Sequence, residues 1–228
     1  MMIYFIIIGV FSLIGTLVSG RLKSKFRQYS QMPTAGGESG AEIARKMLDY
    51  WGVHDVKIVQ GQGTLTDHYN PMTKTVSLSP DVFQGRHVSA AAVAAHECGH
   101  AVQHAEAYSM LTLRSKLVPV VNISGRVQQF LFMAAMFGLG ASFGGPWIML
   151  ALVITFGMTA LFSLITLPVE FDASRRALVW LDESGTTIGT NHEGAKDALW
   201  WAAMTYVTQA LASLTVFLFF LLRFLGSD

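Results

Sequence analysis

Long apolar runs alternate with stretches of mixed polarity along this chain. Residues 2–20, 147–167 and 204–222 are apolar runs without a charged side chain. About 20 such residues cross the hydrocarbon core of a bilayer as a helix. These three runs therefore predict membrane-spanning helices. Because basic residues follow the first run and no small-residue cleavage site is evident, we interpret it as an uncleaved anchor.

A fourth apolar segment, residues 117–143, has a polar face in its first half, where Asn122, Arg126 and Gln129 fall at helical spacing. The Gly-Gly-Pro sequence at 144–146 separates it from the next run and predicts a helical hairpin that crosses the membrane twice. The chain is therefore expected to have about four spans.

Basic residues cluster next to the spans on one side only. Arg21, Lys23, Lys25 and Arg27 follow the first span, two more precede the second, and two follow the third. The positive-inside rule then places residues 21–116 and 168–202 in the cytoplasm and both termini outside.

Residues 28–110 have the pattern of a small soluble domain. Apolar positions at helical spacing predict a helix over 40–50, and short β-like runs lie at 56–59 and 75–78. Ser89 is the expected N-cap of an alanine-rich helix that runs to about residue 107.

Composition and charge agree with a membrane protein. Only 14% of the 228 residues are charged, against about 25% in soluble domains, and mean hydropathy is +0.43. The net charge of +1 gives no basic excess for nucleic-acid binding, so no nucleic-acid partner is expected. The single cysteine, Cys98, excludes an internal disulfide and is expected to be a small packing residue.

The alanine-rich helix carries the motif His96-Glu97-Cys98-Gly99-His100. On a helix the two histidines lie one turn apart and can reach one zinc ion, while Glu97 flanks them as a general base for a water that the ion activates. With 7 His and 7 Glu in the chain, chance predicts only about 0.007 matches to this pattern.

Catalytic zinc usually takes three protein ligands, so another must come from elsewhere in the chain. Glu170 is the preferred candidate, because two membrane crossings return it to the side of the motif. Asp172 is its rival, about 200° around the same helix. The alternative for Glu170 itself is an ion pair with Arg175 or Arg176 at the membrane interface.

Two further histidines lie outside the motif. His104 is two turns from His96, too far for direct ligation, and is expected beside the site or on the surface. His192 is expected either in an exposed loop or near the developing oxyanion.

Four segments of the chain resemble the YugP-type neutral zinc metallopeptidases of bacterial membranes. They are the motif, the sequence from Asp67 to Pro71, the sequence from Ser77 to Phe83 and the sequence PVEFDAS. A more distant similarity is to HtpX and the CAAX-prenyl proteases. This resemblance implies a mainly α, integral membrane, zincin-like fold with a small α+β cytoplasmic domain. It also implies zinc as cofactor, His96, His100 and Glu170 as ligands, and Glu97 as general base.

The resemblance also suggests roles for three further sets of residues near the predicted zinc site. In the distant relatives, an aspartate four residues after the glutamate ligand orients a ligating histidine. This chain has Ser174 at that position, so we expect Ser174 or an unassigned acid to take that role. The run Thr75, Val76, Ser77, Leu78 and Ser79 resembles the edge strand that aligns an extended substrate, and an ordinary sheet strand is the equal alternative. Asp67, His68 and Tyr69 are expected either to line the cleft or to form the turn at Asn70-Pro71.

We expect five segments: an anchor (1–20), a catalytic domain (21–116), a transmembrane hairpin (117–167), a cytoplasmic segment with the third ligand (168–202) and a C-terminal span (203–228). The leading hypothesis is a membrane-bound zinc endopeptidase of the gluzincin type that cuts membrane or cytoplasmic proteins or peptides. Its rival is a non-proteolytic or degenerate zinc-binding membrane scaffold or adaptor, which a closed site with four protein ligands would favour. The sequence leaves the substrate and the oligomeric state open.

Overall fold

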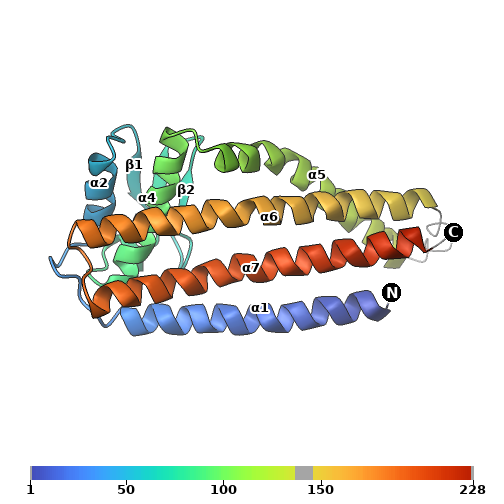
Figure 1. Cartoon of the computed structure of the whole chain (residues 1–228), viewed down its shortest axis with the longest axis horizontal. Coiled ribbons are helices and arrows are strands. Elements are labelled where there is room, and N and C mark those ends of the chain that lie inside the picture. The colour runs from blue at the N-terminus through green and yellow to red at the C-terminus, as the bar shows by residue number, and fades with distance from the viewer. Residues whose placement is uncertain (1, 137–145, 227–228) are drawn as a thin grey trace. The chain divides into compact units, whose positions relative to one another are not determined.

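The computed structural model describes residues 2–136 and 146–226, and these are mainly helical with one small sheet. In chain order the elements are α1 (Met2–Tyr29), α2 (Gly40–Tyr50), β1 (Lys57–Gln60), β2 (His68–Asn70), β3 (Thr75–Leu78), α3 (Pro80–Phe83), α4 (Val88–Ala105), α5 (Ser109–Met136), α6 (Pro146–Glu183) and α7 (Thr190–Leu225) (Figure 1).

Three helices in the described part of the chain are long and apolar enough to cross a membrane: Met2–Tyr29, Trp147–Glu183 and Thr190–Leu225. They contain the predicted first, third and fourth spans. Helix α5 is not among them. The predicted segment 117–143 ends outside the described residues, as do Gly144 and Gly145 of the predicted break.

The chain divides into two compact units. One contains residues 1–16, 112–167 and 205–228. Within its described residues the buried centre is apolar and aromatic, with the rings of Phe156 and Phe220 stacked at 4.9 Å between centroids.

The other unit contains residues 17–111 and 168–204 and holds every residue of the HExxH motif. Helix α2 has the predicted bounds. Its N-terminus carries a capping box, in which Ser39 accepts from the Glu42 amide and Glu42 accepts from the Ser39 amide. The apolar face of α2, with Ile43, Met47 and Leu48, is buried in the core of this unit.

The sheet has the order β1-β3-β2, with β1 parallel and β2 antiparallel to β3. The run Thr75 to Ser79 therefore contains β3, the central strand of the sheet. This agrees with the ordinary sheet strand that was the equal alternative, and not with the edge strand that the resemblance suggested. Both sides of β3 already pair, through Ile58↔Val76 and Tyr69↔Val76, so no substrate backbone can add to it. The edges are β1 and β2, and β2 lies in the sequence predicted as cleft or turn.

Helix α4 carries the motif and is almost entirely buried. Its N-cap is His87, whose Nδ1 accepts from the Ala90 amide at 3.1 Å, so the prediction of Ser89 was wrong by two residues. Ser89 Oγ instead lies 3.0 Å from the same His87 nitrogen. The helix ends at Ala105, close to the predicted end.

Cys98 is fully buried, with its thiol 3.5 Å from the Ala44 carbonyl oxygen of α2. Burial raises the pKa of this thiol, so it stays protonated and unreactive. The expectation of a packing residue is confirmed.

Candidate metal centre

His96 and His100 stand one turn apart on α4, as their spacing requires. Their rings lie 4.8 Å apart between centroids and are nearly perpendicular, at 82°. Both side chains are about nine-tenths buried. Because a buried imidazole needs polar partners, the groups around these rings define what the pair can bind.

Glu170 of α6 is only 2% exposed and faces both imidazoles. Its Oε2 lies 3.3 Å from His96 Nε2 and 3.5 Å from His100 Nε2. Two ligand atoms bound to one tetrahedral zinc at 2.0–2.1 Å are about 3.3–3.4 Å apart. These three residues form the one group in the described part of the chain that is suited to hold a metal ion, with ligand atoms within 4.8 Å of one another.

A close approach of α6 to α4 brings Glu170 to the histidines. A Cβ atom on Gly99 would lie 2.6 Å from the Ala173 carbonyl oxygen, a distance that real Cβ contacts do not reach. The glycine inside the motif therefore allows the two helix backbones to touch one turn from Glu170.

Gln103, which the sequence analysis did not single out, holds the outer nitrogen of His100. Its Oε1 lies 3.0 Å from His100 Nδ1, and its Nε2 donates to the Val169 carbonyl oxygen at 2.8 Å and to Asp172 Oδ2 at 2.9 Å. Because both of those partners are acceptors, the amide nitrogen must face them, and Oε1 must face the histidine. His100 then carries its proton on Nδ1, which leaves the Nε2 lone pair toward Glu170.

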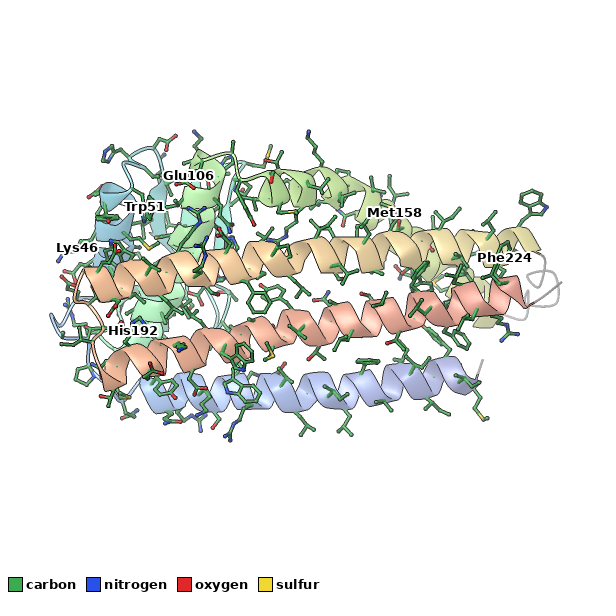
Figure 2. All side chains as sticks on the ribbon, viewed as in Figure 1. Lys46, Trp51, Glu106, Met158, His192 and Phe224 are labelled. Carbon is green, nitrogen blue, oxygen red and sulfur yellow. The ribbon has the colours of Figure 1, made fainter. Side chains whose placement is uncertain are left out.

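Asp172 continues this network away from the site. Its carboxylate accepts from Gln103 and from Arg175 and Arg176, with Arg176 Nε at 2.6 Å. Arg176 also donates to Glu106 Oε2 at 2.7 Å, and Figure 2 labels Glu106 at the end of α4. The acid that pairs with Arg175 and Arg176 is thus Asp172. Asp172 is also linked to His100 through Gln103.

Ser174 Oγ lies 3.1 Å from His96 Nδ1. It occupies the position where the resemblance led us to expect an aspartate. Each histidine therefore has a polar partner on Nδ1, a hydroxyl for one and an amide for the other. Both Nε2 atoms are thereby oriented toward Glu170.

Glu97 follows His96 on α4 and is 8% exposed. Burial raises the pKa of its carboxyl group, and the neighbouring His96 and His100 oppose that shift. A carboxylate that holds a proton more readily than an exposed one is suited to accept a proton and pass it on.

The other predicted residues lie outside the His-His-Glu group. His104 is exposed, and its Nδ1 lies 2.8 Å from the Tyr69 hydroxyl oxygen. His192, labelled in Figure 2, lies near the start of α7, where its Nδ1 is 3.3 Å from Thr187 Oγ1. Asp67 accepts from the Ser79 amide at 2.7 Å and from its hydroxyl, so it links the loop before β2 to the end of β3.

The turn at Asn70-Pro71 is also present. Asn70 Oδ1 accepts from the amides of Met72 and Thr73, at 2.9 and 3.3 Å, which is the side-chain bonding typical of asparagine in turns. His68 and Tyr69 extend into β2 just before this turn.

The chain is similar to known proteins over most of its length. Residues 4–225 match the model of the family described as "Putative neutral zinc metallopeptidase". The chain is 43% identical over 207 residues to "Putative membrane protease YugP" of Bacillus subtilis (strain 168), an alignment that covers 90% of this chain and 89% of that protein. No solved structure matches the chain. From the family model and this relative together, the chain belongs to the neutral zinc metallopeptidase family.

Proposed function

We propose that this protein is a membrane-bound zinc endopeptidase of the gluzincin type, with His96, His100 and Glu170 as zinc ligands and Glu97 as general base. The observation that carries the proposal is the spacing of the three donor atoms. The separations of 3.3 and 3.5 Å match those of ligands on one tetrahedral zinc. The two Nδ1 partners, Ser174 and Gln103, support the same assignment because they orient the Nε2 lone pairs.

Zinc, when bound, supplies the Lewis acidity that polarises a carbonyl group and makes water acidic enough to be a nucleophile at neutral pH. The chain supplies the proton transfers. Glu97 accepts a proton from the attacking water and then donates it to the leaving amine. Its buried position beside His96 keeps its carboxylate at the site and raises its pKa, which favours the return of the proton.

The number of ligands favours a catalytic site over a structural one. A structural zinc site is closed by four protein ligands, whereas a catalytic site has three. Within the described residues the group contains three. Asp172 and His192, either of which as a fourth ligand would have favoured the scaffold, are bonded elsewhere. The scaffold hypothesis is therefore less well supported, because a structural zinc site needs a fourth protein ligand.

Membrane topology extends the proposal. The ends of α1 and α6 and the start of α7 all belong to the unit that holds the site. If α1 crosses the bilayer toward that unit and α6 returns to it, the chain between them must cross once more. We therefore propose four crossings, one of them between α1 and α6, and the cytoplasm as the side of the site. We keep the five segments predicted from the sequence as part of this proposal.

The substrates that fit this placement are cytoplasmic segments of membrane proteins, misfolded proteins and peptides. The proposed partners are accordingly a protein or peptide substrate and the lipid bilayer. The edge of β2, in place of the already paired β3, is the strand that can align an extended backbone near α4.

Glu97→Gln tests the function. We expect the detergent-purified variant to bind one zinc per chain, as the wild type does, and to lose cleavage of an unfolded protein by at least about 100-fold. Glu193→Gln, which changes an exposed glutamate of α7, is the matched control and should leave both measurements unchanged. Unaltered cleavage by Glu97→Gln would refute the proposal, and zinc in the wild type without any cleavage would restore the scaffold hypothesis.

A further inference from the structure

The four basic residues that follow the apolar run of α1 divide into two pairs. Arg21 and Lys25, one turn apart, both contact α7. The guanidinium carbon of Arg21 lies 5.8 Å from the centroid of the Trp201 ring, and Lys25 Nζ lies 2.8 Å from Asp197 Oδ2. This pair is used in packing α1 against α7.

Lys23 and Arg27 are also one turn apart but lie about 200° around α1 from the first pair. Both are exposed. Neither side chain has an ion pair or hydrogen bond with any described residue, in contrast to Lys25. Two cations one turn apart without a protein partner are available to an anion from outside the chain.

These two cations line a cavity of about 640 Å³, which is within the size range of ligand sites. Phe26 and Ser30 of α1 line it too, so the same helix supplies an aromatic ring and a hydroxyl group. The opposite wall includes Leu65, which has a positive φ of 56° and is 38% exposed. A leucine held in the left-handed region and partly exposed at a cavity costs free energy, and an apolar ligand would cover it.

The remaining lining groups set the polarity of the cavity. Thr64 offers a hydroxyl group, and Asp81 is the one carboxylate that the lining contains. His87 is a donor there, because its Nδ1 accepts from Ala90 and its proton must therefore be on Nε2. The cavity has a net positive charge, because its lining has two cations and one carboxylate. Asp81 can act as a hydrogen-bond acceptor for a ligand that also carries hydroxyl groups.

The position of the cavity along α1 indicates its ligand. The apolar run ends at Gly20, so Lys23 and Arg27 lie about 4.5 and 10.5 Å further along the helix axis. The headgroup layer on each side of a bilayer is about 5–7.5 Å thick. An α1 that spans the membrane thus places Lys23 within the headgroup layer. Arg27 lies about 3–5.5 Å beyond that layer, a distance that its long side chain can extend back toward the lipid phosphates.

We propose that this cavity binds the headgroup of a phospholipid, with its phosphate between Lys23 and Arg27 and its glycerol hydroxyls toward Asp81. The carbon atoms of the headgroup alcohol, which lie further from the hydrocarbon core than the phosphate, then cover Phe26 and Leu65. The inference goes beyond the peptidase activity and shares with it only the insertion of α1 in the membrane.

The test is native mass spectrometry of the detergent-purified full chain titrated with phosphatidylglycerol. Loss of both charged contacts to the phosphate is expected to weaken binding of the first lipid by about 30-fold in the double variant Lys23→Gln/Arg27→Gln. The control Arg21→Gln/Lys116→Gln removes two juxtamembrane charges outside the cavity and should stay within about threefold of the wild type. Zinc content, measured on each variant, should be unchanged and reports the integrity of the fold independently of peptidase activity.

Equal weakening in the control would overturn the proposal, because it would indicate general attraction between basic residues and anionic lipid. Displacement of the lipid by equimolar inorganic phosphate would overturn it too, since the site would then select a free anion. If the double variant loses zinc through misfolding, Lys23→Gln alone replaces it, because this change affects only one exposed side chain. Its expected effect is about fivefold, and binding equal to that of the wild type would refute the assignment.

Discussion

Replacement of Gln103 by methionine tests how the chain holds its metal. Methionine has nearly the same length and fills the same fully buried space, but it cannot make the three hydrogen bonds of the amide. The change therefore separates the hydrogen-bonding role of Gln103 from its packing. His100 keeps its place on α4 but loses the acceptor that fixes its tautomer and ring orientation.

The size of the effect follows from the network. Loss of an outer partner of a ligating histidine typically costs 10- to 100-fold in metal affinity, which is about 1.4–2.7 kcal/mol. The Val169 carbonyl also loses a donor, at a cost of about 1–3 kcal/mol to stability if no water replaces it. We therefore expect zinc affinity to fall 10- to 100-fold and the thermal midpoint to fall by several degrees.

The assay is a competition titration of zinc between the purified protein and a chromophoric chelator. Cobalt substitution adds a second measurement, because its absorption spectrum reports the ligand geometry directly. His104→Ala is the matched control: it removes an exposed histidine one residue away on α4 and should leave zinc affinity unchanged. If Gln103→Met binds zinc as tightly as the wild type with the same cobalt spectrum, the argument that Gln103 orients His100 is wrong.

Three further predictions follow from contacts in the same unit. Gly99→Ala should separate α4 from α6 at Ala173 and abolish stoichiometric zinc binding, which is measured by elemental mass spectrometry. A variant that still binds one zinc per chain would refute the argument that the close approach of the two helices is needed for the site. Removal of zinc by a chelator should lower the thermal midpoint of the wild type. The loss of stability is equivalent to about 4 kcal/mol, relative to a free zinc concentration of about 1,000 times Kd. The thermal midpoint of Glu170→Gln should not change. Burial lowers the pKa of His87, so the unfolded chain binds the proton more tightly than the folded one and stability falls as the pH drops below about 6.5. His87→Asn keeps a capping side chain, so its thermal midpoint should fall less than that of the wild type between pH 7.5 and 5.5, and an equal fall would show that His87 is not the group responsible.

Local patterns predicted the helices of the site-bearing unit well, because the cause of each helix lies within its own residues. The periodicity of 40–50 and the alanine-rich run after residue 88 both fold as helices with nearly the predicted bounds. The spacing of His96 and His100 within one helix likewise needs no information from elsewhere in the chain.

Features that depend on a neighbouring element were harder to predict. The central place of β3 depends on β2, a strand of three residues beside a turn, whose local sequence has no clear alternation. The role of Gln103 depends on where α6 presents Val169 and Asp172, and no local pattern encodes that. A polar residue three positions after the second motif histidine, on an otherwise small and apolar helix, was the one available signal.

The division of the site between α4 and α6 has a consequence for biosynthesis. A nascent chain that has emerged as far as residue 116 carries both histidines and the proposed general base but lacks the proposed third ligand, which is made 54 residues later. The complete set of proposed ligands exists only after the intervening hydrophobic segments have been synthesised and inserted. If these residues hold the zinc of a peptidase, the order in which they are made keeps the unfinished chain inactive.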